Sequence, residues 1–221
     1  MISLNQMQIQ AIKTRIFNEN EDLIEFILEN IKENPKKNLE NSIIVITSKI
    51  VALSQGRTVL YKNAKEKIRE KIKLIKQESE FAIKTKITWL TIKDGMVMAN
   101  AGIDESNVLS KFGNKLILLP KDSFKSAEEI RKELKKKFKI KKLGVLITDS
   151  RIFPLRAGVV GVALGYAGFK GVRNYIGKKD IFGRVLKMSR TDIADSLATA
   201  AVLCMGEGKE QQPLAIIKNA P

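Results

Sequence analysis

The sequence predicts a single folding unit in which helices alternate with buried strands. Its 221 residues, 44% of them hydrophobic, are enough to bury one substantial core, or two lobes that share a seam. Segments with apolar residues at helical spacing alternate with short, continuous apolar runs, which are typical of buried strands. No internal repeat and no linker-like stretch divides the chain, so residues 1–221 are expected to form one domain.

Two helices and one strand are expected near the start of the chain. Residues Glu21 to Ile31 carry four apolar side chains at helical spacing. The continuous apolar run Ile43 to Ile46 predicts a buried strand, and Lys62 to Lys76 predicts a basic helix whose charges form a solvated face. The inward side of that basic helix is expected to consist of Ile68, Ile72 and Ile75.

A hairpin and a further helix are expected in the middle of the chain. Ile87 to Thr91 and Gly95 to Ala99 have the pattern of two strands joined by an Asp-Gly turn. Ser126 to Phe138 has helical spacing, and its first residues, Ser126 and Glu129, fit a capping box. We therefore expect this helix to begin at Ser126.

The last part of the chain predicts three strands and one helix. Leu143 to Thr148 is a second continuous apolar run, and Val159 to Gly168 is rich in glycine and valine, as suits a strand with close backbone approach. Thr191 to Met205 predicts a helix with Cys204 on its apolar side, and Leu214 to Lys218 predicts a final short strand.

The absence of histidine and the single cysteine exclude several kinds of catalytic and metal site. The chain has no histidine, which excludes Ser-His and Cys-His catalysis and imidazole metal sites. Its single cysteine excludes an intrachain disulfide and a multi-thiolate zinc site. Oxygen ligands then favour magnesium, manganese or calcium. Because no secretory signal and no long apolar run is present, we expect a soluble, cytoplasmic protein without a membrane span.

The net charge of +16 raises the alternative of a nucleic-acid-binding protein. The lysines, however, are spread along the whole chain, and the aromatic residues, 6% of the total, are not interleaved with the basic runs. A solvated lysine-rich surface is therefore the favoured interpretation, and a polyanionic substrate would suit the same positive field.

Three segments combine an acid with small residues, next to predicted strands or helices: Asn100 to Asn107, Thr148 to Arg151, and Met205 to Glu210. A fourth, Thr47-Ser48-Lys49, offers two hydroxyls and an ammonium group. A carboxylate at a strand end is fixed in position, while a neighbouring glycine lets backbone amides approach a phosphate. Taken singly, each acid is more simply a turn or cap residue.

Together these segments could supply oxygen ligands for one or two divalent ions. The ligands would come from Asp104, Asp149, Ser150 and Glu207. A structural calcium site is a weaker alternative, because the acids lie far apart in sequence and not in one compact loop.

At these residues the chain resembles the coenzyme F(420)-0:L-glutamate ligases, which add γ-linked glutamates to a deazaflavin cofactor. The resemblance covers about residues 21–218 and rests on motifs in a fixed order. They are Thr47-Ser48-Lys49 with Gly56-Arg57, Asn100-Ala101-Gly102-Ile103-Asp104-Glu105-Ser106-Asn107-Val108, Ile147-Thr148-Asp149-Ser150 followed by Arg156-Ala157-Gly158-Val159-Val160-Gly161, Tyr175-Ile176-Gly177-Lys178-Lys179-Asp180-Ile181-Phe182-Gly183-Arg184, and Ala194-Asp195 followed by Met205-Gly206-Glu207-Gly208 and Pro213.

The resemblance implies an α+β fold of two lobes with a nucleotide- and metal-binding cleft between them, and an intertwined homodimer. By position, Asp104 and Asp149 match the ligands of one divalent ion, and Ser150 and Glu207 those of a second. The matching nucleotide-binding residues are Ser48, Lys49, Asn107, Met205, Gly206, Glu207, Gly208, Lys209, Glu210, Gln211 and Gln212. Asp149 and Arg156 are the candidate catalytic residues, with Lys49 as a phosphate contact.

The implied reaction explains this set of residues. A carboxylate is a poor electrophile, so the family phosphorylates it with a nucleotide γ-phosphate, and the glutamate amine then attacks the acyl phosphate. Charge builds on phosphoryl oxygens, which divalent ions neutralise. The implied cofactors are two magnesium or manganese ions and GTP or ATP as co-substrate, with a monovalent cation left open.

Two departures from the family pattern leave the acceptor open. Leu53 stands where relatives often have a lysine near the nucleotide, and Ile12 to Arg15 replaces a loop containing proline and glycine. The deazaflavin acceptor is the first hypothesis, and a folate or other pterin-like acceptor is the second. A non-enzymatic nucleic-acid binder on the same scaffold ranks below both.

Overall fold

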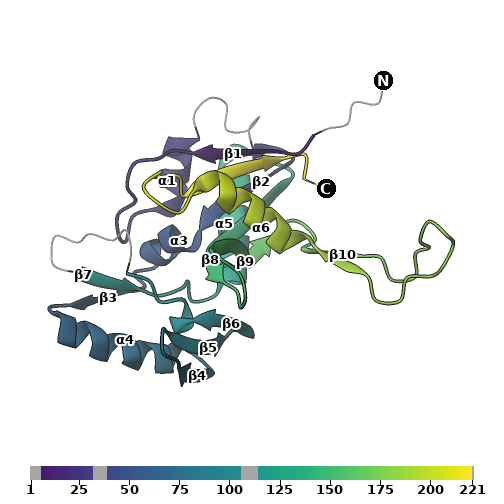
Figure 1. The fold of residues 1–221 in the computed structure, drawn as a ribbon. Helices are drawn as coiled ribbons and strands as arrows, with labels where there is room; N and C mark the ends of the chain where they lie inside the picture. The colour runs from purple at the N-terminus through teal and green to yellow at the C-terminus, as the bar shows by residue number, and fades with distance from the viewer. Residues whose placement is uncertain (1–5, 32–38, 106–113, 221) are drawn as a thin grey trace.

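A computed structural model describes residues 6–31, 39–105 and 114–220 of the chain. Its centre is a five-stranded sheet, in which only the third and fourth strands in spatial order pair in parallel (Figure 1). In spatial order the strands are β1 (Gln8–Ile12), β12 (Leu214–Lys218), β2 (Ser42–Thr47), β8 (Leu143–Ile152) and β9 (Val159–Ala167). Because β2 and β8 are parallel, their carboxyl ends meet at the same edge of the sheet.

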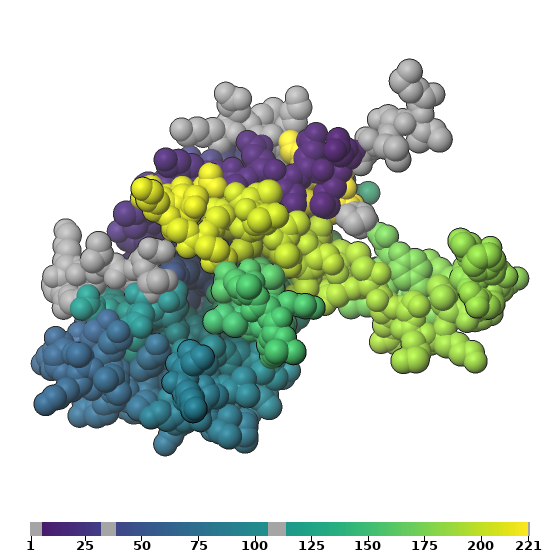
Figure 2. Space-filling view, in the orientation of Figure 1, coloured from purple at the N-terminus to yellow at the C-terminus, as the bar shows by residue number. Residues whose placement is uncertain are grey.

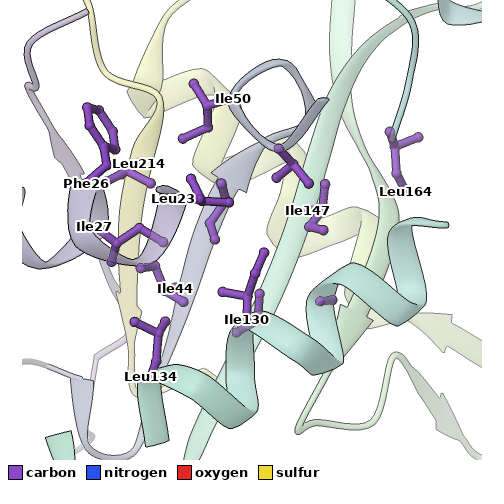
Figure 3. Close-up of a cluster of buried hydrophobic side chains, with 14 of the residues drawn as sticks. Leu23, Phe26, Ile27, Ile44, Ile50, Ile130, Leu134, Ile147, Leu164 and Leu214 are labelled. Carbon is purple, nitrogen blue, oxygen red and sulfur yellow. The ribbon is translucent and has the colours of Figure 1, made fainter. Parts of the chain in front are cut away.

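Helices cover both faces of this sheet. Three helices pack on one face, and a fourth packs on the other. The three are α1 (Leu23–Asn30), α3 (Ser48–Ser54) and α5 (Ser123–Phe138), and the fourth is α6 (Ile193–Met205). Figure 3 shows the larger core, where Phe26, Ile50 and Ile130 from the helices meet Ile44 and Ile147 from the sheet. Strand alternation sends the intervening residues, such as Val45 and Leu146, to the α6 side.

A second, smaller part of the molecule lies beside the carboxyl ends of β2 and β8 (Figure 1). It contains a two-stranded sheet, a three-stranded sheet, one α-helix and a short 3-10 turn, around a core of its own. The elements are β3 (Thr58–Tyr61) with β7 (Asn114–Ile117), β4 (Phe81–Lys84) with β5 (Trp89–Lys93) and β6 (Met96–Ala99), α4 (Ala64–Glu78), and η1 (Asn100–Gly102). The mixed α+β class is thus confirmed.

A long hairpin projects from the main body. Its base is formed by β10 (Val172–Asn174) and β11 (Arg190–Asp192), and we call residues 171–192 the arm. Figure 2 shows the arm standing clear of the rest of the molecule. Separately, no helix among the described residues combines the length and apolar character that crossing a bilayer requires.

Several sequence expectations need correction. Helix α5 begins three residues before Ser126, because Asp122 accepts a hydrogen bond from the Lys125 amide and is the N-cap. Ser126 instead donates its hydroxyl to the Asp122 carbonyl one turn back. In α4, Ile68 is 61% exposed, since only the far end of that helix, around Ile75, reaches the small core.

Two further corrections concern the motifs. Cys204 is exposed, because the buried side of α6 runs through Leu197, Ala201 and Met205. The segment Thr148 to Arg151 is not a loop, because β8 continues through it, paired with β9 across a register shift after Ile147.

Candidate active site

A cavity of about 660 Å³ lies where the two parts of the molecule meet. Its walls come from the carboxyl end of β2, the second half of β8, η1, the segment after α6, and the segment after β1. In open sheets that contain parallel strands, ligands bind at the carboxyl ends of those strands. The volume is within the range of small-molecule and cofactor sites.

Asp149 lines one wall of the cavity. It lies on β8, on the sheet face that carries α3, and its Oδ1 accepts a hydrogen bond from Ser48 Oγ at 3.2 Å. Arg151, two residues along the same strand face, places Nη1 2.6 Å from Asp149 Oδ2. Desolvation raises the pKa of the Asp149 carboxyl, and the charge of Asp104 adds to this, while Arg151 acts in the opposite direction.

Asp104 reaches the cavity from the small part of the molecule. Its backbone pairs with Ile117 through hydrogen bonds of 2.9 and 2.8 Å, and Lys49 Nζ lies 2.7 Å from its Oδ2. The preceding turn explains the Asn-Ala-Gly motif. Asn100, Ala101 and Gly102 all have positive φ, and a Cβ on Gly102 would lie 2.6 Å from Leu119 Cδ1. The motif therefore aims Asp104 at the sheet edge.

Ser150 and Glu207 meet on the opposite side of β8. Ser150 alternates with Asp149, so it faces α6, and its Oγ donates to Glu207 Oε1 at 2.5 Å. Gly206 ends α6 with a positive φ, and Glu210 folds back to accept the Gly208 amide. This local hydrogen bonding fixes the segment that carries Glu207.

The segment from Met205 to Gln212 forms one continuous wall of the cavity. Its end is attached to both neighbouring elements, because the Gln211 carbonyl accepts the Thr14 amide and the Pro213 carbonyl accepts the Thr47 amide. All of the predicted nucleotide-binding residues that the structure describes line this cavity: Ser48, Lys49, Met205, Gly206, Glu207, Gly208, Lys209, Glu210, Gln211 and Gln212. Asn107 lies outside the described residues.

The four predicted metal ligands form two pairs, Asp104 with Asp149 and Ser150 with Glu207. Among the described residues there is no group of three acidic or cysteine side chains close enough to hold an ion by themselves. This donor set nevertheless fits magnesium or manganese. Magnesium is usually bound through one or two carboxylates, and substrate phosphates and waters complete its shell. The residues would suit ions that arrive with a nucleotide.

Arg156, the second predicted catalytic residue, lies in the exposed turn between β8 and β9. It is not among the described residues that line the cavity, and its role stays a prediction. Arg151, by contrast, was not selected from the sequence, although it is 7% exposed and lines the cavity. Arg151 follows Asp149 by two positions, but the two side chains share a strand face only because β8 continues to Ile152, beyond the strand predicted from the sequence.

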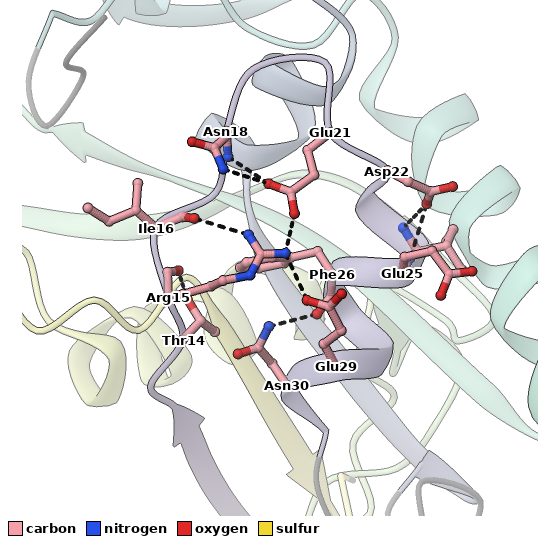
Figure 4. A network of polar contacts seen from close by, with 11 residues as sticks. Thr14, Arg15, Ile16, Asn18, Glu21, Asp22, Glu25, Phe26, Glu29 and Asn30 are labelled. Atoms are coloured by element: carbon pink, nitrogen blue, oxygen red, sulfur yellow. Dashed lines mark hydrogen bonds and ion pairs between the residues drawn. The ribbon is translucent and has the colours of Figure 1, made fainter. Parts of the chain in front are cut away.

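The wall after β1 is held by a polar network around Arg15 (Figure 4). Its Nη2 contacts Glu21 and lies 2.8 Å from Glu29 Oε2, while the guanidinium stacks 4.9 Å from the centre of the Phe26 ring. The hydrogen bonds with Glu21, which has the larger effect, and with Glu29 raise the pKa of Arg15 above its already high usual value. Residues 14–17 therefore form an anchored wall of the cavity.

Comparison with known proteins assigns the chain to a family. The family model described as F420-0:Gamma-glutamyl ligase matches residues 11–219. The chain belongs to this family. The sequence resemblance is thereby confirmed, and the match covers every wall of the cavity from Thr14 to Pro213.

Individual relatives agree with the family model. The coenzyme F420:L-glutamate ligase of Methanococcus maripaludis strain C6 is 36% identical, over 98% of this chain and 89% of the relative. The protein of the same name from Methanothermobacter thermautotrophicus is 34% identical, over 91% and 84%. That of Methanocaldococcus jannaschii is 44% identical over a shorter stretch, 58% of this chain and 49% of the relative.

Proposed function

We propose that this protein is a nucleotide- and divalent-metal-dependent γ-glutamyl ligase that joins L-glutamate by an amide bond to a carboxylate of a coenzyme F420-type acceptor. One observation carries the proposal. Asp104 and Asp149 from one side, and Ser150 and Glu207 from the other, line a single cavity together with the predicted nucleotide-binding segments. The names of the relatives supply the substrate class.

The residues of the cavity suit phosphoryl transfer. Divalent ions bound with the nucleotide would neutralise charge that develops on the phosphoryl oxygens. Asp104 with Asp149, and Ser150 with Glu207, would hold these ions. Lys49, at the start of α3 and 27% exposed along its side chain, would contact a phosphate in addition to Asp104.

The reaction then follows in two steps. The acceptor carboxylate oxygen takes the γ-phosphoryl group of GTP or ATP, which releases the nucleoside diphosphate. The amine of glutamate attacks the acyl carbon, phosphate leaves, and the amine loses a proton. The anchored walls around Thr14 and Gln211 would orient the reactants and so lower the entropic cost of bringing them together.

The arm supports the proposal of a homodimer. It exposes large apolar side chains along a hairpin that makes few contacts with its own body. They are Val172 (48%), Ile176 (41%), Ile181 (92%), Phe182 (76%), Val185 (55%) and Met188 (87%). Apolar patches of this kind mark interaction sites, so a second copy of this chain is the proposed partner. Sedimentation equilibrium of the protein and of F182S would test this.

The experiment for the ligase follows from Asp149. Asp149→Asn keeps the shape of the side chain and removes its charge, so metal-dependent phosphate release in the presence of acceptor, glutamate and GTP should fall at least about 100-fold, the scale on which mutants of such electrostatic groups act. Asp94→Asn, in an exposed turn 64% open at the side chain, is the matched control. Full activity in D149N would refute the proposal.

The acceptor is tested separately. Wild-type protein is incubated with glutamate, nucleotide and a panel containing the deazaflavin acceptor, a folate and another pterin carboxylate. A mass gain of one glutamyl group on the deazaflavin alone supports the proposed substrate. A gain on the folate alone would move the same chemistry to the second hypothesis.

A further inference from the structure

The cations that line the cavity differ sharply in their surroundings. In the described part of the wall they are Arg15, Lys49, Arg151 and Lys209. Arg15 is held by two glutamates, Lys49 lies against Asp104, and Lys209 is exposed in the segment after α6. Arg151 alone among these four is buried, at 7% exposed.

Only one of the two terminal nitrogens of the Arg151 guanidinium has a partner among the described residues. Nη1 contacts Asp149 Oδ2 at 2.6 Å, whereas Nη2 is shielded from solvent and has no hydrogen-bond partner among residues 6–31, 39–105 and 114–220. A buried donor without a partner is costly, and native structures rarely keep one without a reason. A planar guanidinium has donors on both nitrogens in a fixed fork, which matches the oxygens of a phosphate.

The strand geometry says where the missing partner belongs. Arg151 and Asp149 extend from the same face of β8, and the contact of Nη1 holds the guanidinium against the Asp149 carboxylate, in a cavity that Asp104 also lines. An anion near this pair of acids must itself be neutralised by a cation. A phosphoryl group satisfies that requirement, because it would share a divalent ion with Asp104 and Asp149.

We propose that Arg151 is a catalytic residue that binds an oxygen of the transferred phosphoryl group through Nη2, while Nη1 keeps the Asp149 carboxylate in place. This inference rests on the proposed ligase function. It assigns the role to Arg151 and not to Arg156, which lies five residues on in the exposed turn. The electrostatic benefit would be large, because the contact is withdrawn from solvent.

The test compares nucleotides with and without the transferred group. In the presence of magnesium, Arg151→Lys should weaken binding of the β,γ-imido analogue of GTP about 10- to 100-fold, the range for hydrogen bonds to charged groups. Binding of GDP should change by less than about twofold, because GDP lacks that group. Arg69→Lys, on the exposed surface of α4, is the matched control. The adenine nucleotides are measured in parallel.

Removing Arg151 alone leaves a partly buried carboxylate without its partner, so stability is controlled separately. Asp149→Asn is compared with the double variant Asp149→Asn/Arg151→Gln, in which no such carboxylate remains. The double variant should bind the imido analogue about 10-fold more weakly than D149N, with no loss of melting temperature relative to D149N, since it also removes the unpaired buried cation.

Each outcome has one meaning. An unchanged ratio of triphosphate to diphosphate affinity in R151K, with wild-type protein that binds both, overturns this inference alone. A rise only in the KM for glutamate also overturns it, because the anion would then be a glutamate carboxylate. Wild-type protein that binds neither nucleotide overturns the proposed function and this inference together.

Discussion

A three-residue ion cluster connects the small part of the molecule to the cavity, and its central carboxylate is the most informative position to change. Glu78, at the end of α4, lies 2.8 Å from Arg57 Nη2 and 3.0 Å from Lys93 Nζ. Arg57 also donates through Nε to the Leu119 carbonyl, and Leu119 packs against Gly102 in the turn before Asp104. The two cations lower the pKa of Glu78 although burial alone would raise it.

Glu78→Gln should therefore destabilise the protein and disturb Asp104. Removing one partner of a fully buried ion pair costs about 3–5 kcal/mol. Glu78, Arg57 and Lys93 keep 17, 25 and 10% of their side chains exposed, and Lys93 retains Asp94 at 3.7 Å. We therefore expect a smaller loss of roughly 2–3 kcal/mol in the free energy of unfolding. For a chain of this size that corresponds to about 4–12 °C in Tm.

The assay is urea unfolding at several pH values. Because the folded pKa of Glu78 is depressed, its stabilisation is fully present above the unfolded pKa of about 4.3 and disappears as the pH falls through the folded pKa. The difference between wild type and E78Q should thus shrink below that pH. Glu129→Gln, with its side chain 61% exposed on α5, is the control and should change stability by less than about 1 kcal/mol. Equal losses in the two variants, or a pH-independent difference, would refute this reasoning.

Two further predictions concern the walls of the cavity. Gly102→Ala places a Cβ at a φ of +71° and within 2.6 Å of Leu119, so the free energy of unfolding from thermal melts should fall by about 2–4 kcal/mol. Gly95→Ala is the control: it has open space around it, so its stability should fall only by the strain of a φ of +72°. A smaller loss in G102A than in G95A would contradict the packing argument. Arg15→Met should leave the melting temperature nearly unchanged but weaken nucleotide binding in a fluorescence titration, because residues 14–17 lose the contacts of Arg15 with Glu21 and Glu29. Unchanged affinity would show that this wall does not contact the nucleotide.

Much of the fold could be predicted from periodicity, and the misses have physical causes. The final strand was predicted with the correct bounds, and the central strands and the Asp-Gly hairpin within a few residues, because apolar runs and turn residues are local signals. Strands β1 and β4 were not predicted; both are short edge strands, of which β1 is half-buried and β4 largely exposed, so neither forms the continuous apolar run of a central strand. The predicted start of α5 was wrong because both Asp122 and Ser126 are suitable N-cap residues, and Asp122 is the one that caps the helix.

The motifs predicted many of the residues that gather at the cavity, even where the elements around them were wrong. Asp149 was predicted to lie in a loop, yet the residue lines the cavity with the other predicted metal ligands, and its role stays a prediction. The sequence could not reveal which of the nearby arginine side chains is buried. Nothing in the sequence distinguishes Arg151 from Arg156. Arg151 is buried because β8 continues past it, whereas Arg156 is exposed in the turn that follows.

The continuation of β8 also accounts for the division of the four predicted metal ligands into two pairs. Had β8 ended at Thr148, Asp149 and Ser150 would lie on a flexible turn and could face the same way. Within a paired strand they must face opposite sides, one toward Asp104 and the other toward Glu207. A single ion cannot contact side chains on both sides of a strand, so we expect two ions and not one. Titration of the wild-type protein with manganese in the presence of nucleotide, followed by electron paramagnetic resonance, should give a stoichiometry of two, and Glu207→Gln should reduce it to one; a wild-type stoichiometry of one would contradict this use of the strand.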